Sequence, residues 1–192
     1  LGYEALKTNT TANNNTAIGA YALQINSTGS ECTAVGQSAM QQNTTGANNI
    51  AVGKNAMLAN TTGTRNIAIG NTAYDASDTE NDNLAIGHQA MTTNTAGGTR
   101  NLAVGNYALD ALTSGDDNVA VGYDAMTANS TGGANVAVGA YALDTNSTGD
   151  NNVAVGKVAL GANTTGEGNT AVGYASLDAN TTADNNTAVG LR

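Results

Sequence analysis

The sequence predicts an all-β fold, a parallel β-solenoid of 17-residue coils, and two observations lead to this prediction. The tripeptide Ala-Val/Ile-Gly recurs along the chain, and its glycines lie 17 residues apart at every step except one of 18. These glycines are Gly19, Gly36, Gly53, Gly70, Gly87, Gly105, Gly122, Gly139, Gly156, Gly173 and Gly190. Phe, Trp and Pro are absent and aromatic residues make up only 4% of the chain, so large side chains cannot fill a thick core. A thin core repeated along stacked coils fits both observations.

Each repeat is expected to contain two short strands and two turns. In the unit from Asn49 to Arg65, the first strand covers residues 49–52 and is closed by Gly53, and the second covers residues 55–59. Residues 60–63, Asn-Thr-Thr-Gly, form a turn, because Asn and Thr bond to nearby backbone and glycine adopts positive φ. The extra residue of the 18-residue interval falls at the turn that contains Gly97 and Gly98.

Stacking places identical residues in ladders along the rod. An asparagine precedes the first strand in almost every repeat, and only Cys32 interrupts this series. We expect amide-to-amide hydrogen bonds along it. The structural ladder therefore includes Asn49, Asn66 and Asn83, the glycines Gly53, Gly70, Gly87 and Gly122, and the strand residues Val52 and Val121.

Strand alternation predicts two apolar faces. Ala51 and Gly53 point to one face, while Ile50 and Val52 point to the other, because successive side chains of a strand alternate. One face lines the coil interior, and the other needs cover, most simply from another copy of the chain. The residue before the alanine is Thr near both ends and Ile, Leu or Val between them, which predicts that this contact is driest in the middle.

Charge and composition exclude several partners. The formal net charge is -9, with 15 acidic and 6 basic residues and no Lys/Arg cluster, so we expect neither nucleic-acid binding nor contact with an anionic membrane. No apolar run is long enough for a transmembrane helix. Cys32 is the only cysteine, which leaves no disulfide framework and no Cys-x-x-Cys metal site.

The sequence offers no catalytic, cofactor-binding or metal site, so we expect no enzyme activity. His88 is interpreted as a solvated turn residue and Cys32 as a buried neutral substitute for Asn. A calcium site is one interpretation of the Asp residues that share one repeat position and of others in the long turn, but solvated acidic turns fit better. These residues are Asp75, Asp110, Asp144 and Asp178, and Asp116, Asp117, Asp150 and Asp184.

Tyrosines are the candidates for surface recognition. Two adjacent positions of the short turn hold Tyr21, Tyr107, Tyr123, Tyr141 and Tyr174. Such rows either stack on sugars or pack over the turn and against a neighbouring chain. The Asn-Thr/Ser-Thr turn also creates glycosylation sequons, for example at Asn43 and Asn60, which would form a row of sugars in a host that glycosylates asparagine.

Two other functions stay open at this point. The Thr rows raise the alternative of an ice-binding or other extracellular filament-forming solenoid, although ice-binding faces usually place Thr-x-Thr on a strand and here the two Thr are adjacent in a turn. An enzyme built on a β-helix, such as a polysaccharide lyase, would need a cluster of acids or bases. Only residues 75–82 depart strongly from the repeat.

The motif Asn-x-Ala-Val/Ile-Gly resembles the head repeats of YadA-like trimeric autotransporter adhesins, in which Asn-Ser-Val-Ala-Ile-Gly recurs about every fourteen residues. The longer form, residues 152–156 followed by Asn-Thr-Thr-Gly at 163–166, resembles arrays in phage tail-fibre proteins that end in a self-cleaving chaperone domain. This resemblance covers the whole chain. It implies a left-handed β-roll, a homotrimer, and attachment to a host cell or surface through a glycan or receptor. It also implies an extracellular location, on the bacterial surface or in a virion tail fibre. We expect residues 1–192 to be one array of about 11 coils from a longer fibrous protein.

Overall fold

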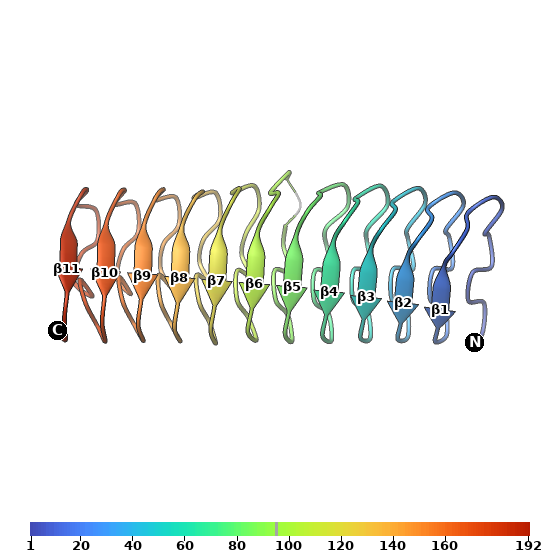
Figure 1. Ribbon diagram of the computed structural model, residues 1–192, viewed down its shortest axis with the longest axis horizontal. Coiled ribbons are helices and arrows are strands. Elements are labelled where there is room, and N and C mark those ends of the chain that lie inside the picture. Colours follow the sequence, from blue (N-terminus) through green and yellow to red (C-terminus); the bar gives the residue numbers. More distant parts are fainter. Residues whose placement is uncertain (95) are drawn as a thin grey trace.

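The computed structural model describes residues 1–94 and 96–192, and the chain forms a rod of stacked coils (Figure 1). Each coil contributes one β-strand of three residues. The strands are β1 (Thr16–Ile18), β2 (Thr33–Val35), β3 (Ile50–Val52), β4 (Ile67–Ile69), β5 (Leu84–Ile86), β6 (Leu102–Val104), β7 (Val119–Val121), β8 (Val136–Val138), β9 (Val153–Val155), β10 (Thr170–Val172) and β11 (Thr187–Val189). They form one parallel sheet in sequence order. The predicted all-β parallel β-solenoid is confirmed.

The register of the sheet matches identical repeat positions. Ala51 in β3 pairs with Ala34 in β2 and with Ala68 in β4, and the same match holds at every step. Ten steps of about 4.8 Å separate β1 from β11, so the sheet is roughly 48 Å long. Residues at the same place in successive coils therefore form straight rows along the rod.

The strand faces are divided as the alternation predicts. Ala51 is fully buried inside its coil, whereas Ile50 on the other face is 38% exposed. The same pattern, a buried alanine between two partly or fully exposed neighbours, holds from β1 to β10. The inner face therefore forms the core and the outer face stays open to solvent.

The second predicted strand, residues 55–59, is wrong, because this segment forms a turn. Asn55 and Met57 have φ values of 57° and 55°, in the left-handed region, whereas a strand needs negative φ throughout. The segment still joins the stack: the Asn55 N–H donates to the Gln37 carbonyl at 2.9 Å and the Met57 N–H to the Ala73 carbonyl at 3.0 Å. Ala56 and Met57 are adjacent and both fully buried, which strand alternation does not permit.

The core is thin and continuous. Most coils contribute two small alanines and one larger side chain, which is fully buried. The larger side chains are Leu23, Met40, Met57, Tyr74, Met91, Leu109, Met126, Leu143 and Leu160. Burying one Leu or Met side chain stabilises by about 1.5 to 3 kcal/mol, so stability accumulates coil by coil.

A glycine ends every strand because the backbones of adjacent coils meet there. Gly53 has a φ of 141°, and a Cβ on it would lie 2.2 Å from the carbonyl oxygen of Gly70. Neither the conformation nor the space admits another residue. The recurrent Ala-Val/Ile-Gly motif therefore follows directly from the stacking.

The predicted insertion lies in the loop between Asn94 and Gly98. Asn43 Nδ2 donates to the carbonyl of Gly46, three residues later, at 2.9 Å. Asn94 Nδ2 makes the equivalent bond to Gly98, four residues later, at 2.7 Å. The loop between β5 and β6 rises above its neighbours in Figure 1, and the sheet register continues unchanged. The insertion is therefore taken up within one turn, as expected.

Candidate functional site

Two rows of buried asparagines hold the coils together. In the row that precedes the strands, the strand asparagine row, Asn49 Nδ2 donates to the Gly63 carbonyl at 2.6 Å across its own coil. Its Oδ1 accepts from the backbone N–H of Asn66 in the next coil at 2.8 Å. The expected amide-to-amide bonds also occur in this row, at 3.1 to 3.3 Å, but they are longer. The backbone-to-side-chain bond is thus the shorter link from coil to coil.

The second row is formed by the asparagines of the Asn-Thr-Thr-Gly turns, here called the turn asparagine row. Asn43 Nδ2 donates to Asn26 Oδ1 at 2.7 Å and to the Gly46 carbonyl at 2.9 Å. These asparagines carry the sequons, and six of them are fully buried: Asn26, Asn43, Asn60, Asn129, Asn146 and Asn163. A row of sugars along this edge does not fit the folded rod, because the amide nitrogens of these asparagines lie inside it.

Cys32 takes the place of an asparagine, as the sequence predicts. Its side chain is fully buried, and its backbone N–H donates to Asn15 Oδ1 at 2.9 Å. Sγ lies 3.4 Å from the Gly46 carbonyl, so the thiol substitutes for the amide that donates across the coil elsewhere. Burial raises the pKa of the Cys32 thiol, which keeps it neutral.

The coil that begins after Gly70 departs from the pattern in its interior. Tyr74 occupies the place of Met57 and is fully buried, which sequence reasoning missed although the repeat alignment gives this position. Its hydroxyl accepts from Asn83 Nδ2 at 2.7 Å, and burial raises its pKa well above the usual value. Ser77 replaces the asparagine of the turn row. Among the described residues, Asn60 Oδ1, Ser77 Oγ and Asn94 Oδ1 are buried without a hydrogen-bond partner.

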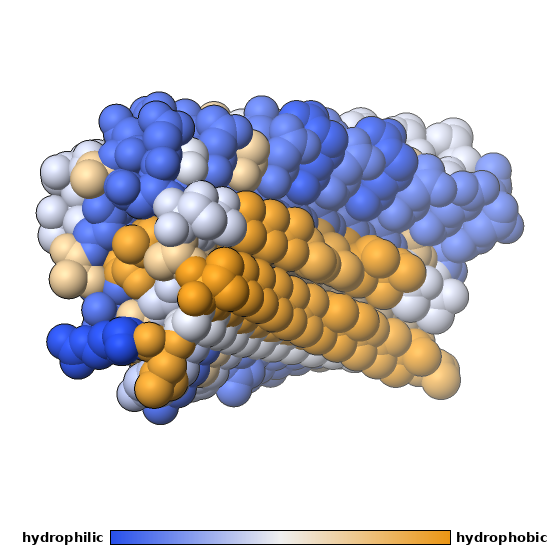
Figure 2. Space-filling model, turned by 60° about the vertical axis from the view of Figure 1, so that its left-hand side comes forward, coloured by the Kyte–Doolittle hydropathy of each residue, from blue (hydrophilic) through white to orange (hydrophobic). Residues whose placement is uncertain are grey.

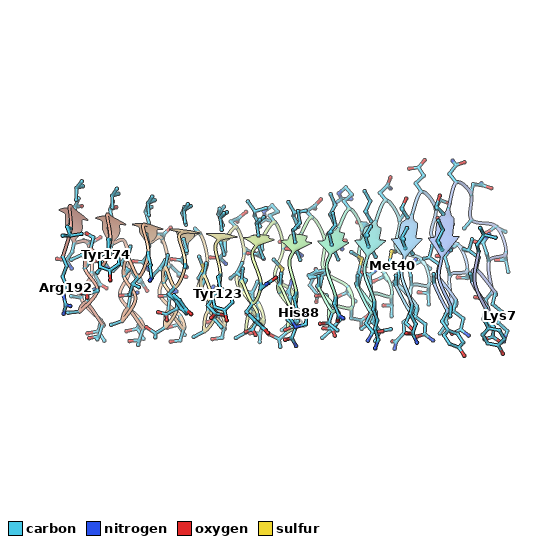
Figure 3. The ribbon with its side chains drawn as sticks, turned by 90° about the horizontal axis from the view of Figure 1, so that it is seen from below. Lys7, Met40, His88, Tyr123, Tyr174 and Arg192 are labelled. Atoms are coloured by element: carbon cyan, nitrogen blue, oxygen red, sulfur yellow. The ribbon has the colours of Figure 1, made fainter. Side chains whose placement is uncertain are left out.

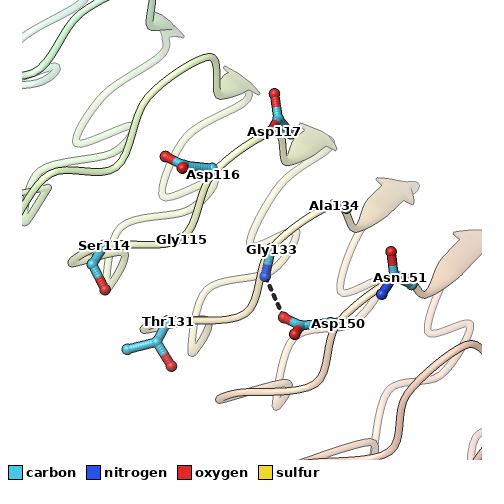
Figure 4. A pocket seen from close by; sticks show the side chains of 9 residues that line it. All are labelled: Ser114, Gly115, Asp116, Asp117, Thr131, Gly133, Ala134, Asp150 and Asn151. Carbon is cyan, nitrogen blue, oxygen red and sulfur yellow. Dashed lines mark hydrogen bonds between the residues drawn. The ribbon is translucent and has the colours of Figure 1, made fainter.

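The acidic residues of the long turn connect neighbouring coils. Asp150 Oδ1 accepts from the Gly133 N–H at 2.7 Å, within a shallow open pocket (Figure 4). Asp116 accepts from the Thr99 N–H at 2.7 Å in the same way. Asp117 forms an ion pair with Arg100, 2.6 Å from Nε. The interpretation as merely solvated turns is therefore incomplete, since several of these carboxylates bond to the preceding coil.

No metal site emerges from these carboxylates. Within residues 1–94 and 96–192, no group of three or more His, Cys, Asp or Glu side chains is arranged to hold a metal ion. The same part of the chain contains no helix with the length and apolarity needed to cross a membrane.

An apolar stripe runs along the open face of the sheet. We define it as the first and third residues of β1 to β11, and Figure 2 shows orange rows of apolar residues running along the rod. Ile50, Ile69 and Val138 in this stripe are 38%, 39% and 37% exposed. Its first positions are Thr in β1, β2, β10 and β11 and Ile, Leu or Val in the other strands. The stripe is therefore most apolar in the middle of the rod.

An aromatic row lies beyond the strand-ending glycines. His88, Tyr107, Tyr123 and Tyr141 make successive edge-to-face contacts, with ring centroids 5.5, 5.9 and 5.6 Å apart. The rings alternate between two repeat positions, yet they adjoin because the Tyr141 N–H donates to the Tyr123 carbonyl at 3.0 Å. Figure 3 shows His88 and Tyr123 on the side of the rod away from the strand arrows. We call these four residues the aromatic row.

The structure groups only some of the predicted tyrosines. Tyr107, Tyr123 and Tyr141 lie together, whereas Tyr21 contacts Tyr3 near the other end of the rod, at 5.4 Å. Tyr174 is 52% exposed and makes no ring contact in the part of the chain that the structure describes. The structure thus brings three of the five predicted tyrosines into one contiguous patch.

Three carboxylates accompany this patch, namely Asp110, Asp124 and Asp144. Burial raises the pKa of Asp110 and of Asp144, and the negative charge of Asp124 raises both further. Asp124 also raises the pKa of Tyr123 through its charge. Sequence reasoning missed Asp124, because its repeat position holds unrelated residues in the other coils.

Comparison with known proteins identifies no relative of this chain. No family model, curated protein or solved structure matches the chain. The apolar stripe and the aromatic row with its carboxylates are the two surface features that a function has to use.

Proposed function

We propose that this chain is a structural and adhesive fibre segment, which spaces or presents a binding surface for attachment to a host cell or surface. The apolar stripe carries the proposal. It is about 48 Å long and roughly 10 Å wide, on the order of 500 Å². Monomeric proteins rarely expose larger apolar patches, and patches of this size often mark interaction sites.

The occupant of the stripe that fits best is a second copy of the same chain. The ridges of the stripe repeat at the spacing of stacked strands, about 4.8 Å, and another rod with the same coil has the same spacing along its whole length. The charge of -9 also disfavours nucleic acid and anionic membranes as the partner. A protein fibre built from identical rods satisfies both points.

Three copies around one axis are the arrangement we propose. Closed symmetry buries identical stripes without leaving an open face that would continue into a filament. The resemblance of Asn-x-Ala-Val/Ile-Gly to YadA-like head repeats and to phage tail-fibre arrays favours a left-handed, homotrimeric roll. It also favours an extracellular location, on a bacterial surface or in a virion tail fibre. The proposed role is structural and adhesive, without catalysis.

The oligomeric state tests this proposal. Light scattering coupled to size exclusion should give a trimer for the parent chain. Combining Val119→Asp, Val136→Asp and Val153→Asp should split it into monomers. A matched control places the same three charges on exposed residues of the turn edge, as Thr131→Asp, Thr148→Asp and Thr165→Asp, and should stay trimeric. A parent chain that is monomeric at micromolar concentration contradicts the proposal.

A milder variant guards against loss of folding. Val119→Thr, Val136→Thr and Val153→Thr place in β7, β8 and β9 the residue that β1, β2, β10 and β11 already hold at this position. This variant should retain the circular dichroism spectrum of the parent. Its trimer should dissociate at a higher protein concentration than the parent trimer does. If it folds and associates as tightly as the parent, the stripe is not the interface.

Ice binding is the alternative, and one observation weighs against it. The first Thr of the turn uses its hydroxyl to bond to the next coil: Thr44 Oγ1 donates to the Thr61 carbonyl at 2.9 Å, and Thr164 Oγ1 to the Thr181 carbonyl at 3.0 Å. Only the second row, with Thr45 and Thr62, remains exposed. Faceting of a growing ice crystal in the presence of the chain would favour ice binding over the fibre.

A further inference from the structure

The three tyrosines of the aromatic row expose parts of their side chains to solvent on three consecutive coils. Tyr123 is 47% exposed and Tyr141 is 37% exposed, and Tyr107 is partly exposed beside them. The face of an aromatic ring carries negative electrostatic potential and attracts cations, most strongly ammonium and guanidinium groups. The row is therefore one half of a cation-binding surface.

The repeat itself shows how the three carboxylates lie relative to one another. Asp110 and Asp124 are 14 residues apart. Asp178 and Arg192 are also 14 residues apart, and they occupy the same two repeat positions four coils further along the rod. Arg192 Nε lies 3.3 Å from Asp178 Oδ2. The two positions are thus neighbours on adjacent coils, close enough for an arginine side chain at one to reach an aspartate at the other.

A second equivalence places Asp144 next to Asp124. These residues are 20 apart, as are Glu4 and Gln24 at the same repeat positions, and Gln24 Nε2 donates to Glu4 Oε2. Asp124 therefore has two neighbouring positions, those of Asp110 and Asp144. In other coils the equivalent pairs of positions contain an arginine or a glutamine that bonds to a carboxylate. Here both positions hold carboxylates.

The charges of this patch are not compensated from within the described residues. Glu4 pairs with Lys7 and Asp178 with Arg192 on the same side of the rod, but Asp110, Asp124 and Asp144 make no ion pair there. Like charges at adjacent positions repel, and an external cation relieves that repulsion. The carboxylates supply the other half of the surface.

The chemistry selects an organic cation over a metal ion or a neutral sugar. The described part of the chain has no cluster of carboxylates close enough to share a metal ion. The rings meet at 84° and 69°, so they do not form the flat platform on which sugar rings stack. A neutral sugar would also leave the three negative charges uncompensated.

We propose that Tyr107, Tyr123 and Tyr141, together with Asp110, Asp124 and Asp144, bind an organic ammonium or guanidinium group. The cation lies against the exposed tyrosine rings, its N–H groups donate hydrogen bonds to the carboxylates, and the carboxylates compensate its charge. This inference rests on the proposed function, since it names the chemical class that the adhesive surface recognises. The source is either a lysine or arginine side chain of a surface protein or a small amine.

Titration calorimetry on the full chain tests the site with four probes. A tetralysine peptide represents a protein source, and spermidine and choline represent small amines. Maltoheptaose, a neutral oligosaccharide, represents a sugar. We expect at least one cationic probe to bind and to weaken with added salt, and maltoheptaose not to bind. Calcium chloride serves as a fifth injection and should not compete.

Matched variants connect binding to the patch. Asp124→Asn should lower the affinity for the cationic probe about five- to tenfold, the range expected for a charged, partly solvated contact. Tyr123→Leu should also weaken it. Asp75→Asn changes a carboxylate in the same row as Asp110 and Asp144, but the equivalent neighbours of Asp75 are Asn55 and Gln89, so this control should leave binding unchanged.

Three results would overturn the inference: no binding of any cationic probe at millimolar concentration, equal binding by the Asp124→Asn variant, or preferential binding of maltoheptaose. The oligomeric state, measured on the same samples, separates this failure from that of the proposed function. A trimer without cation binding removes only the site, whereas a monomer that binds the cation removes only the assembly.

Discussion

A Cβ atom on Gly122 would lie 2.5 Å from the carbonyl oxygen of Gly139 in the next coil. Gly122 also has a φ of 148°, a conformation that residues with a side chain rarely adopt. Both facts follow from the close approach of neighbouring coils at the end of each strand. This corner therefore determines how tightly the rod is stacked.

Gly122→Val should destabilise the rod by several kcal/mol, because the new side chain meets backbone that cannot move without separating two coils. Thermal unfolding followed by circular dichroism measures the effect. Gly97→Ala is the control: Gly97 has a φ of 111°, but no atom of the described residues lies within 4 Å of the added Cβ. This control experiences backbone strain without the clash and should lose clearly less stability. Equal losses in the two variants would show that only the conformation matters.

Cys32→Asn should stabilise the chain by about 1 kcal/mol, the net contribution of one hydrogen bond. In the neighbouring coils, Oδ1 of the strand asparagine row accepts the backbone N–H of the next asparagine, as Asn49 does for Asn66 at 2.8 Å. A thiol cannot accept as well, so the new amide would bond to the Asn49 N–H. An increase in the melting temperature is expected, and Cys32→Ala should lower it. A decrease for the Asn variant would mean that the amide does not fit at this place.

Replacing both Asp110 and Asp144 by Asn should raise stability at pH 7 and leave it unchanged at low pH. Burial raises the pKa of both carboxyls above 3.8, helped by the charge of Asp124, so the folded rod holds their protons more tightly than the unfolded chain does. Ionised Asp110 and Asp144 therefore lower the free energy of unfolding at pH values above their pKa in the folded rod. This loss disappears at pH values below their pKa in the unfolded chain.

Chemical unfolding of the parent and the double variant between pH 3 and pH 7 measures this dependence. The control is Asp117→Asn, because the Arg100 guanidinium lowers the pKa of Asp117. That substitution should destabilise at pH 7 and have no effect at low pH, the opposite sign. A pH-independent difference for the Asp110/Asp144 variant would refute the burial argument.

Tyr74→Met combined with Ser77→Asn should slow hydrogen exchange in the coil between β4 and β5. The new asparagine would supply a partner for the buried Asn60 Oδ1, which has none among the described residues. Met at residue 74 would make room, as Met57 and Met91 do in neighbouring coils. Amides in distant coils, such as that of Val153 in β9, serve as the internal reference. Faster exchange in the altered coil would show that Tyr74 stabilises it.

The sequence was sufficient for the stacked parallel sheet, because the glycine interval fixes the coil and strand alternation fixes the two faces of β3 and its neighbours. It was not sufficient for the path of the chain between Gly53 and Asn60. There Asn55 and Met57 adopt left-handed conformations that nothing in their side chains requires, since bonds to adjacent coils hold them. The adjacent apolar pair Ala56 and Met57 was the available signal against a strand.

The candidate site was predictable in part for a similar reason. The tyrosines stand out in a chain with few aromatic residues, so Tyr107, Tyr123 and Tyr141 were identified from composition and repeat position. Their contact joins residues at two different repeat positions on adjacent coils, which the bond from the Tyr141 N–H to the Tyr123 carbonyl at 3.0 Å brings side by side. Sequence spacing alone does not reveal this contact, because it depends on the path of the chain in the turn.

The loop between Asn94 and Gly98 holds one residue more than its counterparts, and β6 nevertheless pairs with β5 in the common register. The length of this loop can thus change while the strands on either side keep their pairing and register. Longer segments introduced at the same place would project sideways from the rod while the strand asparagine row continues past them, from Asn83 to Asn101 and Asn118. This turn is accordingly the natural point at which a foreign peptide could be displayed, at a height along the fibre set by the number of coils beneath it.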